Sequence, residues 1–109
     1  KILFSSDLFG SFATHWDLFL QFDPACHTCT NFLECPEGKA YCPVPDILQF
    51  HQQVMPNGKA LALAMRRIGE LEIDAIAPQH GAILRDRRDI QHLIKLLSNL
   101  EGVGIDGVE

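Results

Sequence analysis

Apolar residues along the chain fall into compact runs, typical of buried strands, and spaced stripes, typical of helices. The compact run KILFSS at 1–6 leads directly into Asp7, so a short buried strand that ends on a carboxylate is expected. The run IDAIAP at 73–78 is apolar on both faces, as in a parallel strand between layers of helices, and His80 and Gly81 follow it. Two buried strands, far apart in the sequence, are therefore expected.

Four further segments carry apolar residues at helical spacing, and each is expected to form a helix. They are residues 11–22, 46–54, 57–71 and 89–100. The apolar stripe of the third comprises Leu61, Met65, Ile68 and Leu71. Asp46 and Asn57 are expected to cap the second and third helices, and Gly102 suits the C-terminal cap of the fourth. The order strand, helix, helix, helix, strand, helix is typical of an α/β layer fold.

Residues 24–45 interrupt this pattern and have the character of an inserted loop. They show hardly any periodicity and contain all four cysteines and four of the six prolines. Because a loop of about 20 residues without structure of its own is uncommon in a compact domain, something is expected to hold it in place. Residues 101–109 are rich in glycine and are expected to be a linker or tail, which assigns the domain to residues 1–100.

Composition and charge narrow the classes of partner. The formal net charge is -5, and Lys and Arg are scattered, which disfavours binding to nucleic acid. No apolar run approaches the ~20 residues that a bilayer crossing needs. The chain begins without an initiator Met or a signal-peptide pattern. It is therefore expected to be a cytoplasmic piece of a longer protein, without a membrane segment.

Four cysteines form the first constellation that suggests chemistry. Cys26, Cys29, Cys35 and Cys42 follow the spacing C-x2-C-x5-C-x6-C. A C-x2-C pair places two thiolates on one side of a tight turn, and two more thiolates complete a tetrahedral site. Zinc, an iron–sulfur cluster, disulfides and reduced thiols stay open, although a cytosolic compartment favours metal over disulfides. His27, inside the pair, is an alternative ligand.

Asp7 and His80 form the second constellation, because each follows a predicted strand. Ligand sites of α/β sheets lie where strands give way to loops. A carboxylate and an imidazole are first-choice ligands for zinc or non-haem iron. The simpler alternative is that Asp7 caps the following turn and His80 fills a turn beside Gly81. Two ligands do not make a complete site.

The remaining histidines and one charged cluster are expected to have structural roles. His15 and His51 fall on predicted helices, where a partly buried, hydrogen-bonded imidazole is the commoner case. His92 is expected on the polar side of its helix. The cluster RDRRD at 85–89 is expected to be a solvated turn and helix start.

Two segments resemble the flavodiiron and oxygen-binding diiron proteins of the metallo-β-lactamase fold superfamily. LFSSDLFGSF at 3–12 is similar to the region around their bridging aspartate. The segment 54–84 is similar to their run from a Met-Pro pair, through a helix, to Pro-x-His-Gly. The resemblance implies that Asp7 bridges two metal ions and His80 binds one of them. It also implies the second, C-terminal half of an αββα sandwich, with the Cys-rich loop inserted.

The same resemblance implies a fragment of a non-haem diiron domain that binds or reduces dioxygen or nitric oxide. Residues 85–100 lack any aromatic residue, and no phosphate loop for FMN follows, which favours a flavin-free, sensor-type relative. An electron donor or signalling domain is then expected elsewhere in the parent chain. Two alternatives stay open: a zinc-dependent hydrolase of the thioesterase or lactonase type, and a non-catalytic regulatory domain with a Cys-ligated metal.

Whether the parent protein is an oxidoreductase is left open by the sequence. The fragment alone holds only part of the ligand set, so it is expected to bind metal weakly and to be inactive. A half-sandwich also leaves an apolar face uncovered, so the fragment is expected to self-associate.

Overall fold

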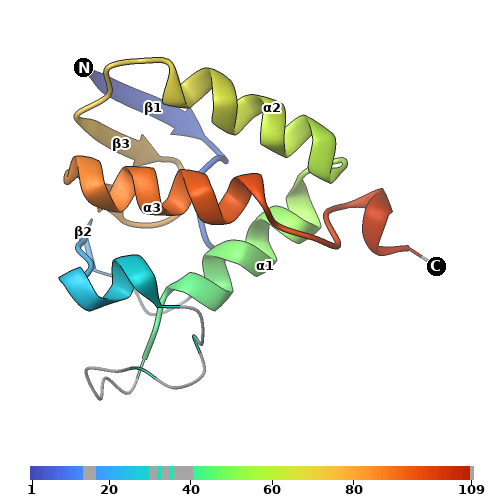
Figure 1. Cartoon of the computed structure of the whole chain (residues 1–109), viewed down its shortest axis with the longest axis horizontal. Coiled ribbons are helices and arrows are strands. Elements are labelled where there is room, and N and C mark those ends of the chain that lie inside the picture. Colours follow the sequence, from blue (N-terminus) through green and yellow to red (C-terminus); the bar gives the residue numbers. More distant parts are fainter. Residues whose placement is uncertain (14–16, 30–31, 33–34, 36–40, 109) are drawn as a thin grey trace.

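The computed structural model describes residues 1–13, 17–29, 32, 35 and 41–108. It confirms a mixed α/β fold, in which helices lie over a sheet (Figure 1). The elements, with η for a 3-10 helix, are β1 (Ile2–Ser6), β2 (Phe19–Leu20), η1 (Pro24–Thr28), α1 (Val44–Val54), α2 (Gly58–Gly69), β3 (Ala75–Pro78), β4 (Ile83–Leu84), α3 (Arg87–Ser98) and η2 (Ile105–Gly107).

The sheet has the strand order β1-β3-β4-β2. β1 and β3 run parallel, with Ile2 opposite Ala75, although most of the chain separates them. β3 and β4 run antiparallel, and β4 pairs in parallel with β2. The two strands expected from the sequence therefore lie side by side.

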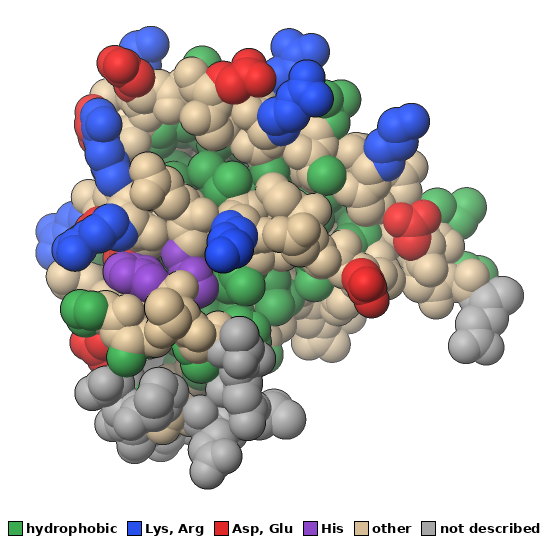
Figure 2. Space-filling view, viewed as in Figure 1, with side chains coloured by type: hydrophobic (Ala, Val, Ile, Leu, Met, Phe, Trp, Pro, Cys, Tyr) green, Lys and Arg blue, Asp and Glu red, His purple; other side chains and the backbone are tan. Residues whose placement is uncertain are grey.

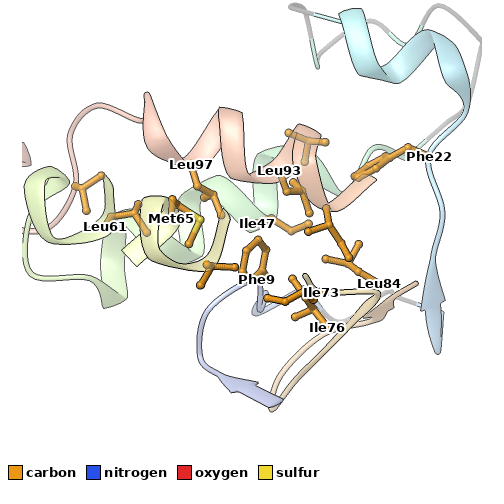
Figure 3. Close-up of a cluster of buried hydrophobic side chains, with 14 residues drawn as sticks. Phe9, Phe22, Ile47, Leu61, Met65, Ile73, Ile76, Leu84, Leu93 and Leu97 are labelled. Atoms are coloured by element: carbon orange, nitrogen blue, oxygen red, sulfur yellow. The ribbon is translucent and has the colours of Figure 1, made fainter. Parts of the chain in front are cut away.

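The core lies between the sheet and the helices (Figure 3). Leu61 and Met65 of α2 and Leu93 of α3 are fully buried, as are Ile76 of β3 and Leu84 of β4. The apolar stripes expected over 57–71 and 89–100 supply a large part of this core, and α1 and the strands supply much of the rest. Leu71 is the exception, because it lies beyond the end of α2 and is exposed.

β1 is not the buried strand that was expected. Its residues alternate between exposed and half-buried, and Phe4 is 80% exposed while Leu3 packs against the core. Successive side chains of a strand point to opposite faces, so Ile2 and Phe4 share the face turned away from the core. The described part of the chain covers one face of β1 and leaves this one open.

The predicted helix over 11–22 is wrong in the residues that the structure describes. Phe19–Leu20 form β2 instead, opposite Ile83 and Leu84, and the Ile83 amide donates to the Leu18 carbonyl at 2.7 Å. Pairing with a distant strand overrides a local helical period, because a strand is stabilised by its neighbours. His15 lies outside the described residues.

The helix ends agree with the sequence in part. The Asn57 side chain accepts a hydrogen bond from the Ala60 amide at 2.7 Å, which confirms it as the cap of α2. Asp46 does not cap α1, because that helix begins two residues earlier, behind Pro43. α3 ends at Ser98, with Asn99 at its C-terminal cap, so Gly102 lies beyond it.

Residues 101–108, expected as a linker or tail, pack against the corner between α1 and α2. Val103 is fully buried, and the Gly58 amide donates to Asp106 Oδ2 at 2.8 Å. Gly104 has a φ of +54°, and a β-carbon there would lie 2.2 Å from the Met55 and Pro56 carbonyl oxygens. Only glycine fits so close an approach.

Charged side chains are dispersed over the surface. On the face seen in Figure 2, Lys and Arg are interspersed with Asp and Glu and do not gather in one stripe. Among the described residues, no helix combines the length and apolarity that a membrane crossing needs.

Candidate metal centre

Asp7 and His80 emerge at the same edge of the sheet. Ser6, at the end of β1, is paired with Pro78, at the end of β3, and the Gln79 amide donates to the Ser6 carbonyl at 2.7 Å. Asp7 and His80 follow these positions, and both are exposed. The parallel pairing thus brings together the two ligands expected from the sequence.

Gly10 lies between the backbones of these two residues. Its amide donates to the Asp7 carbonyl at 3.0 Å, and the next amide, of Ser11, donates to the His80 carbonyl at 2.9 Å. A β-carbon at Gly10 would lie 2.5 Å from the His80 oxygen and 2.9 Å from the Asp7 oxygen. These distances are shorter than van der Waals contact, so a residue without a β-carbon is needed where the two segments meet.

The loop that carries Asp7 has a strained backbone. Ser6 and Phe9 have φ values of 55° and 66°, a region that residues other than glycine rarely adopt. Such conformations persist where the surrounding structure imposes them, and they gather at functional sites. The buried Phe9 ring, 2% exposed, provides one such constraint.

His51 of α1 provides the second constraint on this loop. The Phe9 amide donates to His51 Nε2 at 3.0 Å, so the proton of the neutral ring is on Nδ1, which donates to the Ile47 carbonyl at 2.7 Å. Burial lowers the pKa of His51 and keeps Nε2 available as an acceptor. The expectation of a buried, hydrogen-bonded His51 is confirmed. Its contact with the Asp7 loop was missed, because sequence spacing does not show which loop faces α1.

Gly81 turns the backbone away from His80. Its φ is +123°, in a region that favours glycine. This conformation agrees with the turn that the resemblance implies at this position.

The exposed carboxylate and imidazole fit part of a metal centre. Among the described residues, no group of three or more His, Cys, Asp or Glu side chains is arranged to hold one ion. A complete centre at this edge would need further ligands beside Asp7 and His80.

Three of the four cysteines line a cavity beside α1. Cys26, Cys35 and Cys42 line this cavity, whose volume is about 380 Å³. Burial raises the pKa of the Cys42 thiol. A hydrogen bond with the Val44 backbone opposes this shift, and the nearby Cys26, Cys29 and Cys35 add to it. Within the described ranges, no disulfide joins these four residues.

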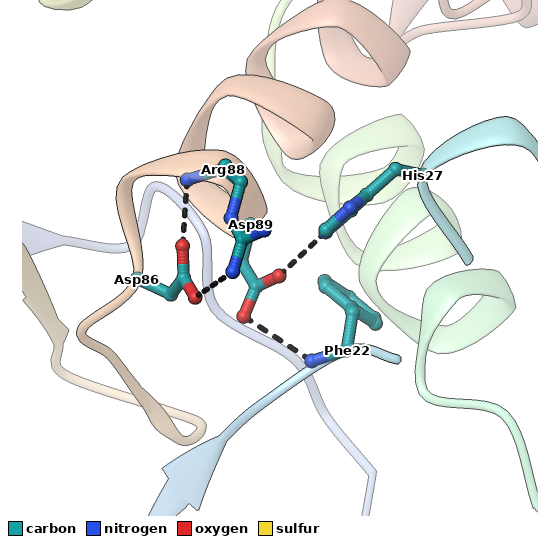
Figure 4. Close-up of polar contacts among 5 residues, drawn as sticks. All are labelled: Phe22, His27, Asp86, Arg88 and Asp89. Atoms are coloured by element: carbon teal, nitrogen blue, oxygen red, sulfur yellow. Dashed lines mark hydrogen bonds and ion pairs between the residues drawn. The ribbon is translucent and has the colours of Figure 1, made fainter. Parts of the chain in front are cut away.

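A hydrogen bond between Asp89 and His27 joins the start of this loop to α3 (Figure 4). Asp89 is fully buried; its Oδ1 accepts from His27 Nε2 at 2.8 Å and its Oδ2 accepts from the Phe22 amide at 3.2 Å. The His92 ring packs against the His27 ring, with centroids 5.6 Å apart.

Two expectations are therefore corrected. Asp89 does not belong to a solvated cluster, and His92 is 8% exposed rather than on a polar face. The physical reason is that η1 packs on the first turns of α3. Burial, and then the proximity of His27, lower the pKa of His92. The sequence holds no local signal for this contact, because 62 residues separate His27 from Asp89.

Comparison with known proteins gives one family and two similar solved structures. The family model described as "ODP family beta lactamase" matches residues 1–81. The structure "Peroxy diiron species of chemotaxis sensor ODP" is 26% identical, with a TM-score of 0.71 over 98% of this chain. "Apo state of chemotaxis sensor ODP from T. denticola" is 28% identical, with a TM-score of 0.66 over 96% of this chain. The chain covers 38% and 36% of those two chains. No curated protein matches it.

Proposed function

Because the chain belongs to the ODP family, of metallo-β-lactamase-like fold, we propose that it is half of a diiron domain that binds dioxygen within a sensor protein. The observation that carries the proposal is the emergence of Asp7 and His80 together at one sheet edge. The narrower resemblance to flavodiiron proteins, and the reduction of dioxygen or nitric oxide, stay predictions. The similar structures support sensing, since both are named as chemotaxis sensors.

Each residue at this edge has a definite part in the proposal. Asp7 would bridge the two irons, and His80 would bind one of them. The iron pair, when bound, supplies the capacity to bind dioxygen. Gly10 sets the approach of the two ligand-bearing segments, and His51 holds the Asp7 loop through the Phe9 amide. The other ligands, and a signalling domain or an electron donor, would lie outside this chain.

Iron content tests the proposal. The protein, in its longest encoded form, is purified without oxygen, and iron per chain is measured with the absorption change on admitting air. Asp7→Ala and His80→Ala should each lower the iron content at least several-fold, because each removes a ligand. The matched controls are Glu72→Ala and Gln79→Ala. Both side chains are exposed; Glu72 lies shortly before β3 and Gln79 directly follows it.

Two results would contradict the proposal. Equal iron content in all five proteins would remove Asp7 and His80 from the metal site. Zinc alone, together with hydrolysis of thioesters or lactones, would favour the zinc-dependent hydrolase, whose water is activated by the metal.

A further inference from the structure

We propose that Cys26 and Cys42 are a reversible modification site, a pair of thiols that hydrogen peroxide oxidises to a disulfide. The oxidant is a small neutral peroxide, and a soluble thiol compound reverses the step. This site goes beyond the proposed function and does not depend on it, because it uses neither Asp7 nor His80.

One cavity receives both side chains. Cys26 and Cys42 are half-buried, and both line the cavity of about 380 Å³ beside α1. Cys29 is not among the described residues of this lining. The charged residues of the described lining, Asp17 and Asp23, are both acidic. A neutral oxidant is therefore favoured over an anionic one.

The two elements that carry the pair are fixed to the core. Cys26 lies in η1, and the next residue, His27, is hydrogen-bonded through Nε2 to the buried Asp89 of α3 at 2.8 Å. Cys42 lies just before α1, whose first residue, Val44, is 2% exposed. Because both backbones are held in this way, the approach of these two thiols is a property of the fold.

Of the possible partners of Cys42, Cys26 is the best placed. Among the described residues that pack against the core, Cys26 and Cys42 are the two cysteines. Burial is the largest cause of the raised pKa of Cys42, and of the other cysteines Cys26 contributes more than Cys29 or Cys35. Electrostatic effects weaken with distance, so this order agrees with the pair chosen from the cavity and the core.

The oxidation proceeds in two steps. The sulfur of one cysteine attacks an oxygen of hydrogen peroxide: an S–O bond forms, the O–O bond breaks, and the leaving hydroxide takes the thiol proton and departs as water. The second sulfur then attacks the sulfur of this sulfenic acid: an S–S bond forms, the S–O bond breaks, and a second water leaves with the second thiol proton. The two thiols lose two electrons and two protons, and the peroxide is reduced to water.

The pair shares its cavity with residues beside the candidate metal centre. Ser11, whose amide donates to the His80 carbonyl, and Gly81, which follows His80, line the same cavity. In a reducing compartment, disulfides are ordinarily transient and often sense redox state. Oxidation of Cys26 and Cys42 would thus register peroxide close to the backbone that positions His80.

The test uses the longest encoded form, treated with a chelator and dithiothreitol, separated from both, and then exposed to a small excess of hydrogen peroxide. The remaining thiols are alkylated, and the protein is digested without reduction for mass analysis. Peptides joined through Cys26 and Cys42 should be the main disulfide product, several-fold above any other pairing of the four cysteines. Dithiothreitol should return both residues to a form that can be alkylated.

Two controls separate the effect of the fold from simple reactivity. Cys26→Ser and Cys42→Ser should each abolish this product, whereas Cys29→Ser should retain it, because Cys29 is outside the described lining of the cavity. Oxidation in urea, which removes the cavity, should give a mixture of pairings. If a serine variant does not fold, the comparison of the folded and the urea-treated wild-type protein still decides the question.

The proposal fails if peroxide leaves Cys26 and Cys42 open to alkylation, or oxidises them without joining them. It also fails if the folded protein gives the same mixture of pairings as the protein in urea, or if Cys29→Ser abolishes the product. None of these results would affect the iron measurements for Asp7 and His80.

Discussion

The His51 imidazole joins two backbone segments through both of its nitrogens. One segment is the preceding turn of α1, at Ile47, and the other is the strained loop at Phe9. Both contacts need the neutral ring, because a protonated Nε2 can no longer accept from the Phe9 amide. Asp7 lies two residues before Phe9. The position of its exposed carboxylate therefore depends on the buried His51.

Stability should fall as the pH falls below the ordinary histidine pKa of 6.5. Burial lowers the pKa of His51, so the unfolded chain takes up protons first. The stability from the neutral ring is then complete above pH 6.5 and is lost as the pH decreases toward the lowered pKa. Urea unfolding at about pH 7.5 and about pH 5.5 measures the loss.

His51→Gln should show a smaller loss between these two pH values, since it cannot protonate. His92, whose pKa burial also lowers, keeps part of the dependence in that variant. Asp74, with a pKa lowered to about 2 by the N-terminal amine and Arg87, titrates below this range. An identical pH dependence in the two proteins would contradict the role given to His51.

Two glycines should respond in opposite ways to the same substitution. Gly10→Ala should destabilise by about 1–3 kcal/mol, because its β-carbon would meet two backbone carbonyl oxygens. Gly69→Ala, at the end of α2, has open space within 4 Å and should cost nothing or gain up to about 1 kcal/mol. Urea unfolding compares them, and equal effects would show that the two loops are not in contact at Gly10.

At the scale of elements, the hydrogen bonds that Asp89 of α3 accepts from His27 of η1 and from the Phe22 amide should contribute far more than a surface ion pair. Asp89→Ala leaves His27 and the Phe22 amide without their buried acceptor, and should cost about 2–4 kcal/mol of unfolding free energy. Glu70→Ala breaks an exposed pair with Arg66 and should cost at most about 0.5 kcal/mol. Equal unfolding midpoints for the two variants would refute this difference.

Helices whose apolar residues recur at helical spacing over several turns could be predicted from the sequence, and strands of two residues could not. α2 and α3 have apolar stripes, and α2 has Asn57 at its cap, so local chemistry is enough to locate them. β2 and β4 have two residues each and are defined by their pairing: β4 pairs with both β2 and β3. The prediction of a helix at 11–22 was wrong because the spacing of apolar residues does not show that Phe19–Leu20 pair with the distant strand β4.

The candidate site was predictable to a similar extent. Asp7 and His80 follow strands whose compositions were recognisable, so their common edge could be expected. The contacts of His51 and Asp89 join segments far apart in the sequence. A single sequence gives no means of placing one segment on another, so these buried contacts were missed.

At the scale of the whole molecule, the open face of β1 should make the isolated chain associate. Ile2 and Phe4 are 63% and 80% exposed on one side of the strand, and the similar structures are much longer chains. Phe4→Glu should shift sedimentation of the isolated chain toward monomer, since a charge opposes apolar association. Leu63→Glu, at an exposed position of α2, is the matched control and should leave the distribution unchanged.

The longest encoded form should respond to the same substitution differently. There Phe4→Glu should lower the unfolding midpoint, because the rest of the domain would cover this face. Self-association that is unaltered by Phe4→Glu would show that another surface joins the copies.

The parallel pairing of β1 with β3 also has a consequence for folding during translation. Ile2 lies opposite Ala75, so a ribosome must finish β3 before β1 can find its partner. During that interval a newly made apolar strand is open to other nascent chains, as in other topologies with distant pairings. Chaperone protection would matter most in this window. Metal binding by Asp7 and His80 together would then have to await the synthesis of β3, since the second ligand leaves the exit tunnel long after the first.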